Sequence, residues 1–599
     1  MGPDLWELYE YGEADDEVAA IIRLAHFGAL PPGVRVITQF EEIITVRLHR
    51  GDIPKISGAP ETAGMSSGDT YFGADLEIDA VDSESLPPHT ATDTDHRRPD
   101  DLAMTGRGIV IGIVDWGLDF RHPDFRKADG TSRILALWDQ RGGKQPKSPQ
   151  PYGYGVVHTR ETINNALAQK DPYATLGYHP ADADTGIGCH GTHVASIAAG
   201  SGGEGRPAGM APEADLVFVH NAPWDGLEGG KLGDSVTLLE AIDFIARTAA
   251  GRPWIVNLSM GRHGEQHDGT TLIEEGLDAA VRAAAGRAIC MSAGNYYNKR
   301  THASGQLRPT QKRSLEWVVN ENNPSDYNQL EVWYSWQDKF EVEVRSPNDL
   351  IIATARLGEK VKLISGGKEI GNLYHRAQEP NTLDHHVTVY LYKTAPPGEW
   401  SVTLTGTDVI HGNYHCWIER EVSCPKCQSH FKNEDADPTS TTGTICNGRR
   451  TIAVGAYDAH DPGRRIGPFS SVGPTRDGRL KPDLCAPGVS VLAARSAQRE
   501  HPDATPLTTR MSGTSMAAPF VAGACACAFQ AAVRPLRIEE THNLLLGSAR
   551  RVTVEDRDPE RIGIGFVDVS AFVDAAGRVD NGQRTFVAVR ETRSAPAKT

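Results

Sequence analysis

The 599-residue chain has few cysteines, a deficit of basic residues and no long uninterrupted apolar run. Its nine cysteines are an odd number spread along the chain, which argues against a disulfide framework and favours a reducing compartment. The longest apolar stretch, residues 516–533, is interrupted by Pro519, Gly523 and Gln530 and is too short to span a bilayer. The N-terminus has no basic segment followed by an apolar run, so it carries no recognisable secretory signal. Together these absences predict a cytoplasmic protein that has no membrane partner.

The deficit of basic residues is concentrated at one end of the chain. In total, 61 Lys and Arg face 78 Asp and Glu, a formal net charge of −17. The first hundred residues hold seven basic and 20 acidic residues, so the remaining 499 are almost neutral. No sustained basic stripe is present, which excludes dedicated nucleic-acid binding. The first hundred residues therefore form a separate acidic unit.

This acidic unit has a secondary-structure pattern of its own. Residues 15–27 predict an amphipathic helix with an acidic first turn, and Pro31, Pro32 and Gly33 end it. Residues 34–38 and 43–48 alternate as two short strands, and residues 53–59 predict a helical turn. We expect a small α+β domain over residues 1–78. A linker rich in Asp, Ser, Thr and Pro follows over residues 79–105.

A different sequence pattern begins at Gly108. Continuous apolar runs, as expected of parallel strands buried on both faces, occur at residues 109–114, 216–219, 254–258, 288–292 and 452–454. Helical stretches lie between several of them, at residues 191–199, 235–249 and 272–285. The alternation predicts a parallel α/β sheet with helices on both faces, and its ligands would bind at the carboxyl ends of the strands.

The alternation of strands and helices is interrupted in the middle of the chain. Residues 310–420 are strand-like, with Pro, Gly, Asn and Asp turns and no comparable helix, which predicts an inserted all-β sandwich or jelly roll. The resulting division has a first α/β segment at 106–305, the insertion at 306–433, a second α/β segment at 434–578 and a C-terminal tail at 579–599.

Three residues that carry chemistry lie at strand ends or helix starts. Asp115 ends the first buried strand, His190 opens a helix and Ser515 opens another. The chain order Asp, His, Ser is one of the orders known for catalytic triads. A serine hydroxyl needs a base within hydrogen-bond reach, and the imidazole needs a carboxylate that fixes its tautomer. Asn295, which follows a buried strand, could donate its amide to an oxyanion together with the backbone N–H of Ser515.

Each of these positions also has an ordinary structural interpretation. An Asp at a strand end is usually a turn residue, and a Gly-Thr-Ser step before a helix is usually an N-cap. His190 and His193 could form half of a metal site, or one of them could pack in the core. The triad is favoured because three residue types in a known order, together with an oxyanion donor, all fall at the switch points of one α/β pattern.

The motifs around these residues resemble the subtilisin-like serine proteases (subtilases). The resemblance lies in the stretches His190-Gly-Thr-His-Val-Ala-Ser196, Gly513-Thr-Ser-Met-Ala-Ala-Pro519 and Asp115-Trp-Gly117. The stretch Asp129-Gly-Thr-Ser-Arg-Ile-Leu-Ala-Leu-Trp-Asp139 and the β insertion are similar to bacterial subtilases that carry an inserted jelly roll, such as the clostridial Csp germination proteases.

The resemblance implies a serine endopeptidase that acts on proteins or peptides. It implies that Ser259, Met260 and Gly261 pair with the substrate backbone, and that Ala293 and Gly294 form part of the wall of the S1 pocket. It also implies that residues 1–78 act as a propeptide that inhibits the protease from within the same chain. The alternative for these residues is an independent docking domain.

One departure from the family pattern supports a competing hypothesis. The family usually has Ser or Thr after the catalytic Asp, whereas this chain has Trp116. The alternative function is a pseudoprotease or a partner-binding module that uses the β insertion, although all three triad residues are present.

We expect no required cofactor. Calcium sites are frequent in the family, but no acidic cluster fits a specific calcium loop. Four cysteines include a Cys-x-x-Cys pair whose spacing suits tetrahedral zinc, but one lies in an expected strand and another at a later junction, so we favour unligated thiols. These cysteines are Cys416, Cys424, Cys427 and Cys446.

Overall fold

The computed structural model describes residues 1–67, 72–73, 98–184, 186–222, 234–321, 327–348, 350–421, 427–551 and 559–579. For residues 72–73 only the backbone is described. Three sequence predictions fall outside these ranges: most of the linker, at residues 79–97, Cys424 and the tail at 580–599.

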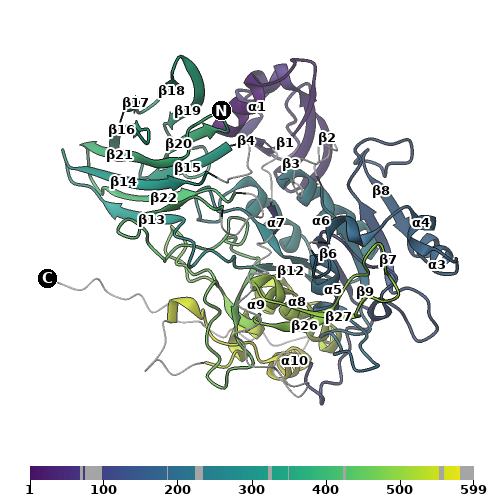
Figure 1. The fold of residues 1–599 in the computed structure, drawn as a ribbon. Coiled ribbons are helices and arrows are strands. Elements are labelled where there is room, and N and C mark those ends of the chain that lie inside the picture. The colour runs from purple at the N-terminus through teal and green to yellow at the C-terminus, as the bar shows by residue number, and fades with distance from the viewer. Residues whose placement is uncertain are drawn as a thin grey trace.

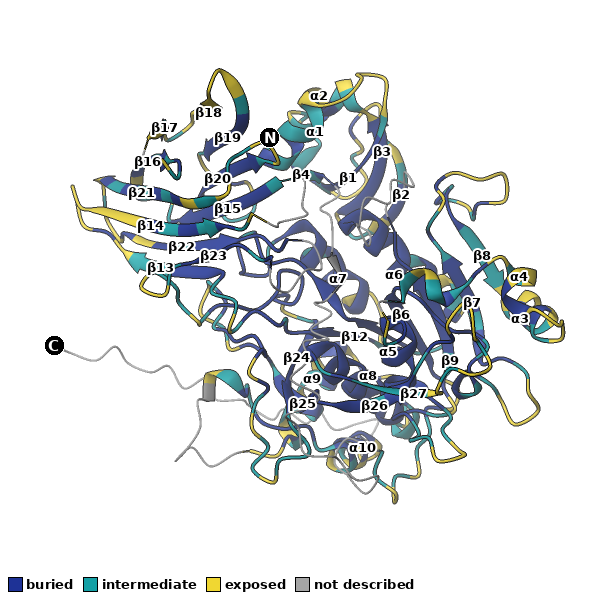
Figure 2. Cartoon of the chain, viewed as in Figure 1, coloured by how far each residue is buried: buried dark blue, intermediate teal, exposed yellow. Residues whose placement is uncertain are grey.

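An eight-stranded sheet forms the centre of the molecule (Figure 1). Its strands are parallel except for β8, which runs antiparallel to β7 at one edge. Every residue of β6 and β10 is buried, which is why these strands are continuous apolar runs in the sequence (Figure 2). In spatial order the strands are β25 (Leu484–Pro487), β24 (Ile452–Tyr457), β12 (Arg287–Ser292), β10 (Trp254–Leu258), β6 (Val110–Asp115), β9 (Asp215–His220), β7 (Ile134–Asp139) and β8 (Val156–Thr159).

Helices cover both faces of this sheet, as predicted. Helices α6 (Ser235–Ala249) and α7 (Leu272–Arg282) lie on one face, and α5 (His190–Ala199) and α8 (Thr514–Ala531) lie on the other (Figure 1). Within the described residues, α8 is the one helix long and apolar enough to cross a membrane, and 89% of that stretch is buried inside the protein, as in a core helix. The central domain also contains α3 (Arg160–Leu167), α4 (Pro172–Leu176), α9 (Ile538–Ser548) and α10 (Val569–Gly577).

The expected all-β insertion is present as two antiparallel sheets that enclose a core of their own. Trp317 and Trp400 are fully buried in that core. The first sheet contains β13 (His302–Gln306), β22 (Asn413–Ile418), β15 (Tyr327–Tyr334), β20 (His385–Tyr392), β19 (Lys368–Arg376) and β18 (Lys360–Ser365). The second contains β17 (Ile351–Arg356), β16 (Lys339–Arg345), β21 (Gly398–Asp408), β14 (Lys312–Val319) and β23 (His430–Phe431). A short separate pair joins β26 (Val491–Ala494) to β27 (Thr508–Met511).

The N-terminal unit is a four-stranded antiparallel sheet with two short helices. Its strands, in spatial order, are β2 (Arg35–Phe40), β3 (Ile43–His49), β1 (Glu17–Leu24) and β4 (Thr62–Ser67), and its helices are α1 (Pro3–Glu10) and α2 (Ile53–Ser57). This sheet packs against α6 and α7 of the central domain. Ile21 and Ile43 therefore belong to the same buried core as the central sheet.

The prediction of a helix at residues 15–27 is wrong. This stretch forms β1, which pairs with β3 along one edge and with β4 along the other. Val18 to Ile22 are five consecutive buried residues, because a central strand covered on both faces needs a continuous apolar run. Such a short run fits a strand and a helix face equally well, and tertiary pairing decides between them.

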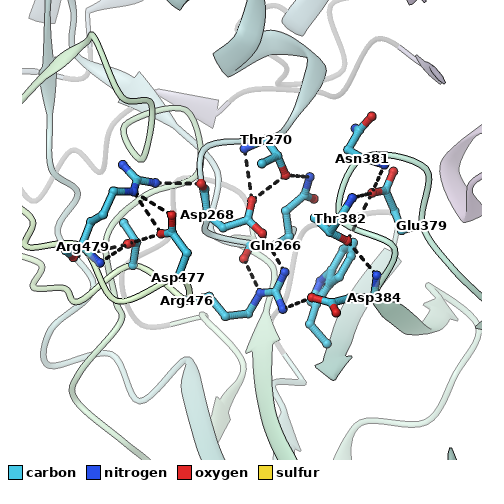
Figure 3. Close-up of polar contacts among 12 residues, drawn as sticks. Gln266, Asp268, Thr270, Glu379, Asn381, Thr382, Asp384, Arg476, Asp477 and Arg479 are labelled. Carbon is cyan, nitrogen blue, oxygen red and sulfur yellow. Dashed lines mark hydrogen bonds and ion pairs between the residues drawn. The ribbon is translucent and has the colours of Figure 1, made fainter. Parts of the chain in front are cut away.

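The insertion is attached to the central domain by a polar network that joins three distant segments (Figure 3). Arg476 donates to Asp268 at 2.7 Å and to the carbonyl of Gln266 at 2.8 Å, and it also pairs with Asp384 of the insertion. Arg479 donates to the carbonyl of Asp268 at 2.7 Å. The loop that follows residue 261 is thus held by the insertion on one side and by residues 476–479 on the other.

A cluster of buried histidines fills the same junction. His267 and His302 stack on Trp417, with ring centroids 4.2 and 5.0 Å away, and the Nε2 atom of His302 lies 3.0 Å from Nδ1 of His415. Burial lowers the pKa of His302 to about 4 and that of His415 to about 2. The charged groups near the cluster are Asp268, Glu331, Asp437 and Arg476. The cluster is therefore neutral at neutral pH.

Acid is expected to destabilise the protein through this cluster. The pKa of His302 in the folded chain is below the ordinary value of 6.5, so stability is fully present above pH 6.5 and is lost as the pH falls toward 4. The loss expected from His302 alone is about 3 kcal/mol. Urea midpoints of a Ser515→Ala chain, measured across this range with and without His302→Gln, check the slope. The exposed His411→Gln is the matched control, and equal slopes in all three chains would contradict the prediction.

Candidate active site

Asp115 and His190 form a buried hydrogen-bonded pair. Asp115 is the last residue of β6, and His190 is the first residue of α5. The Nδ1 atom of His190 lies 2.8 Å from Oδ1 and 3.1 Å from Oδ2 of the Asp115 carboxylate. Burial raises the pKa of Asp115 above its usual value, while His190 and the backbone N–H of Trp116 act in the opposite direction. The carboxylate is thus placed to hold one imidazole tautomer, with a proton on Nδ1.

Ser515 lies in the first turn of α8, with 1% of its surface exposed. Its Oγ atom and the Nε2 atom of His190 are both buried, and neither has a hydrogen-bond partner among the described residues. Because neither atom is engaged in a hydrogen bond, both are available to a reacting group. Hydrogen bonds between a nucleophile and its base often become short only when substrate is bound.

Asn295 borders the same helix start. Its side-chain oxygen accepts hydrogen bonds from the backbone N–H and the hydroxyl of Thr514, both at 3.0 Å. These bonds orient the amide so that Nδ2 lies beside Gly513. A Cβ atom added to Gly513 would lie 3.3 Å from Nδ2 of Asn295 and 3.6 Å from the backbone nitrogen of Ser515. Two N–H donors therefore flank one small space that glycine leaves open, as an oxyanion requires.

The residues expected to pair with substrate divide into two groups. Met260 and Gly261 form β11 (Met260–Gly261), which pairs antiparallel with β5 (Phe72–Gly73) from the end of the N-terminal unit. The hydroxyl of Ser259, by contrast, points inward and donates to the carbonyl of Ser515 at 3.0 Å. Ser259 thus supports the backbone of the nucleophile, whereas Met260 and Gly261 present an edge to an extended chain.

A small recess of about 10 Å³ opens beside this edge. Gly294 lines it, whereas Ala293 does not line it and accepts a hydrogen bond from the backbone N–H of Gly443 at 2.8 Å. Sequence reasoning did not assign several other residues to the recess, of which two flank the 293–295 stretch and three come from a later segment of the chain. These are Ser292, Tyr296, Gly443, Ile445 and Cys446. Burial raises the pKa of Cys446 to about 12, so the thiol is neutral.

Trp116 stacks flat on His190. The two ring centroids are 4.3 Å apart and the ring planes are 6° from parallel. Only 3% of the Trp116 surface is exposed. The indole therefore covers one face of the imidazole without occupying either of its nitrogens. A parallel aromatic face restrains the ring and attracts an imidazolium cation.

This stacking predicts a specific effect of Trp116 on turnover. Trp116→Leu is expected to lower kcat about tenfold with little change in KM, because the leucine fills space but offers no aromatic face to the imidazolium. Trp116→Phe is expected to keep most of the activity. Steady-state kinetics with one peptide substrate distinguish the two variants. Equal kcat values for the leucine variant and the wild type would show that the indole has only a packing role.

The four cysteines with zinc-like spacing are not joined as four thiolates. Cys416 and Cys446 are free and buried, Cys427 is in a disulfide, and Cys424 lies outside the described residues. A disulfide removes the thiolate of Cys427 from any zinc site. Among the residues that the structure describes, no group of three or more His, Cys, Asp or Glu side chains could hold a metal ion.

A parallel α/β sheet with Asp, His and Ser at its strand ends and helix starts defines the class of serine peptidases with a triad. The model of the Subtilase family matches residues 106–332 and 412–565, and the chain belongs to this family. The unmatched residues 333–411 fall inside the β insertion.

Solved and curated proteins are also similar to the chain. The structure of the Clostridium perfringens CspB protease is similar, with a TM-score of 0.67 and 24% identity, and the match covers 80% of this chain and 97% of that one. This likeness concerns the fold. A PII-type proteinase of Lacticaseibacillus paracasei is 24% identical over 78% of this chain and 26% of its own length. The minor extracellular protease Vpr of Bacillus subtilis is 23% identical over 88% of this chain and 59% of its own length. The chain thus spans about a quarter of the length of the first relative and about three fifths of the length of the second.

Proposed function

We propose that the chain is a serine endopeptidase that hydrolyses peptide bonds through an acyl-enzyme on Ser515. The observation that carries the proposal is the buried Asp115–His190 pair, whose Nε2 has no other partner, together with an equally unpartnered Ser515 hydroxyl. Membership of the subtilase family supports the same reaction.

The chemistry assigns one step to each group. His190 Nε2 takes the proton of Ser515 as Oγ attacks the carbonyl carbon, and it later delivers that proton to the leaving amine. Asp115 accepts the Nδ1–H bond and stabilises the imidazolium while it exists. Asn295 Nδ2 and the backbone N–H of Ser515 donate to the carbonyl oxygen as it becomes negative. A water then attacks the acyl-enzyme, with His190 as its base.

The substrate would be an extended peptide. It would add a strand to β11, as β5 does within the chain, and place a side chain in the recess beside Gly294. Because Tyr296, Ile445 and the neutral Cys446 line that recess and it is small, we expect a small apolar side chain at the cleaved bond.

Labelling with a fluorophosphonate probe tests the proposed nucleophile. The wild type is expected to become labelled, and the Ser515→Ala chain is expected to remain unlabelled. Ser512→Ala is the matched control, because its hydroxyl lies three positions earlier and accepts from the backbone of Ser490. A folded wild type, freed of its N-terminal domain, that never labels would instead favour the pseudoprotease or partner-binding alternative.

We further propose that the N-terminal domain inhibits the protease from within the chain. Support comes from two contacts: β5 covers the β11 edge that a substrate would use, and the four-stranded sheet packs on α6 and α7. A cut within residues 79–105 is expected to raise activity once the domain leaves. N-terminal sequencing of purified wild type beside Ser515→Ala reports whether the chain makes that cut itself. Equal activity before and after removal of the domain would contradict inhibition by the N-terminal domain.

Arg47 is expected to contribute strongly to the binding of the N-terminal domain to α6 of the central domain. It makes two hydrogen bonds to the Glu240 carboxylate of α6, at 2.8 and 2.9 Å, and both side chains are fully buried. Arg47→Ala leaves the Glu240 carboxylate buried without its partner and should weaken the contact by about 3–5 kcal/mol. The expected result is faster hydrolysis of a fluorogenic peptide.

Two variants control the Arg47 experiment. Replacing both Arg47 and Glu240 by methionine should restore most of the inhibition, because no charge is left unpaired. Arg35→Ala removes an exposed pair with Glu17 and should change little. A fast double variant, or an Arg47→Ala chain as slow as the wild type, would contradict the role of this ion pair.

The cytoplasmic location and the independence from a cofactor rest on the sequence alone. One relative is named an extracellular protease, so cell fractionation with an antibody to this chain is the direct measurement of location. Activity after dialysis against a chelator measures the need for calcium.

A further inference from the structure

The N-terminal helix α1 lies between two domains and contacts each with a different face. Leu5 is buried in the core of the N-terminal sheet, and Leu8 packs against the same core. Asp4, Glu7 and Glu10 follow each other at intervals of three residues and contact the insertion. Figure 1 draws α1 beside β18, β19 and β20, at the boundary between the purple and teal parts of the chain.

Glu7 is the centre of the contact with the insertion. Its carboxylate accepts hydrogen bonds from the hydroxyl of Tyr374 at 2.5 Å, from the side-chain amide of Asn372 at 2.9 Å and from the hydroxyl of Tyr392 at 3.0 Å. Three donors converging on one carboxylate form a strong and directional site. Burial, and after it the hydrogen bond to Glu7, raises the pKa of Tyr374, which keeps this hydroxyl a donor.

The neighbouring carboxylates are matched in the same way. Tyr390 donates to Asp4, and Lys360 pairs with Glu10 at 2.5 Å while its ammonium lies 5.3 Å from the ring centre of Trp6. Tyr11, just past the helix, meets Tyr392 with the hydroxyl oxygens 2.9 Å apart. We call the donor residues of the insertion the acidic-helix face. They are Lys360, Asn372, Tyr374, Tyr390 and Tyr392.

A helix of eight residues is not stable alone in water, so α1 depends on the surfaces that hold it. Packing against the N-terminal sheet is enough to bury Leu5 and part of Leu8. Each of the three carboxylates has a matching donor on the insertion. The spacing and chemistry therefore go beyond what anchoring an apolar helix requires.

We propose that the acidic-helix face is a recognition site for acidic helices. In this chain α1 occupies the site, and this contact fastens the N-terminal domain to the insertion. A partner protein that presents carboxylates at the same three-residue spacing competes with α1 for this face and loosens the inhibitor. The regulatory part rests on the proposed inhibition by the N-terminal domain, whereas the recognition part does not.

Hydrogen exchange and peptide binding on the full chain test the recognition. Glu7→Lys is expected to speed exchange in residues 3–10 at least tenfold, because it places an ammonium against three donors. A labelled peptide of residues 1–14 is expected to bind this variant, whose face is vacated, and to bind the wild type far more weakly because α1 competes at high effective concentration. The same peptide carrying Glu7→Lys is expected to bind about 100-fold more weakly.

The controls separate recognition from general disturbance. Glu13→Gln changes an exposed carboxylate just beyond the helix and should leave exchange and peptide binding as in the wild type. Glu7→Gln keeps the shape of the side chain and should give an intermediate exchange rate. Unchanged exchange in Glu7→Lys, or a vacated chain that does not bind the wild-type peptide, would overturn the proposal.

Turnover of a peptide substrate distinguishes the recognition part of the proposal from the regulatory part. If the N-terminal domain inhibits, Glu7→Lys or an excess of an acidic-helix peptide raises kcat/KM. If the peptide binds as expected and turnover stays constant, the recognition site stands and inhibition by the domain is refuted.

Discussion

Replacing His190 by alanine is expected to lower kcat for peptide hydrolysis by about 10⁶-fold. In the proposed reaction the imidazole is the base that takes the proton of the Ser515 hydroxyl, and without it the nucleophile stays protonated at neutral pH. The residues of a triad act as a unit, so a chain lacking both His190 and Ser515 should be about as slow as either single variant. The residual rate above that of water would come from the oxyanion donors at Asn295 and Ser515.

His193 offers a matched control one turn further along α5. It is buried, and its Nε2 atom lies 3.0 Å from the carbonyl of Val491. Burial lowers its pKa to about 3, so it is neutral and engaged in packing. His193→Gln should keep most of the turnover measured with a fluorogenic peptide. A loss in this variant as large as that in His190→Ala would instead favour a shared role for the two histidines, such as half of a metal site.

The central fold could be predicted because a parallel sheet leaves a strong signal. Strands such as β6 and β10 are buried on both faces, so their apolar runs are visible without any partner. The three candidate triad residues could be singled out for a related reason: Asp115, His190 and Ser515 sit at a strand end or a helix start, which the sequence pattern locates.

The errors arose where long-range contacts decide the structure. The apolar run of β1 fits a helix face, and only its pairing with β3 and β4 makes it a strand. Helix α1 has no strong pattern of its own, because the partners of its carboxylates lie 350 to 386 residues away on the insertion. Ile445 and Cys446 reach the recess beside Gly294 and Tyr296 through the fold, not through adjacency to these residues in sequence.

Trp116 illustrates a third kind of limit. The sequence shows that this residue departs from the family pattern, which is the observation behind the pseudoprotease alternative. The stacking of the indole on His190 could not be inferred, because it depends on the side-chain orientation of both rings. A residue that breaks a motif is thus readily noticed, but its consequence needs coordinates.

Asp115→Asn is expected to lower kcat by about 10⁴-fold, with little change in KM. In the wild type, the Asp115 carboxylate accepts a hydrogen bond from His190 Nδ1, which leaves Nε2 unprotonated and able to take the Ser515 proton in the proposed reaction. An asparagine amide can donate to Nδ1, which selects the opposite tautomer and puts a proton on Nε2. The asparagine also brings no charge to stabilise the imidazolium. Both effects act on the chemical step, so substrate binding should change little.

Asp139→Asn is the matched control for this variant, because Asp139 ends the nearby parallel strand β7 as Asp115 ends β6. Its carboxylate pairs with Arg141 at 2.9 Å and touches no residue of the triad. We expect its kcat to stay within about twofold of the wild type. Steady-state kinetics of the two variants at equal pH separate a role in the reaction from the loss of a carboxylate at a strand end. Comparable losses in both would show that Asp115 acts through stability, and the orienting role assigned to it would then be wrong.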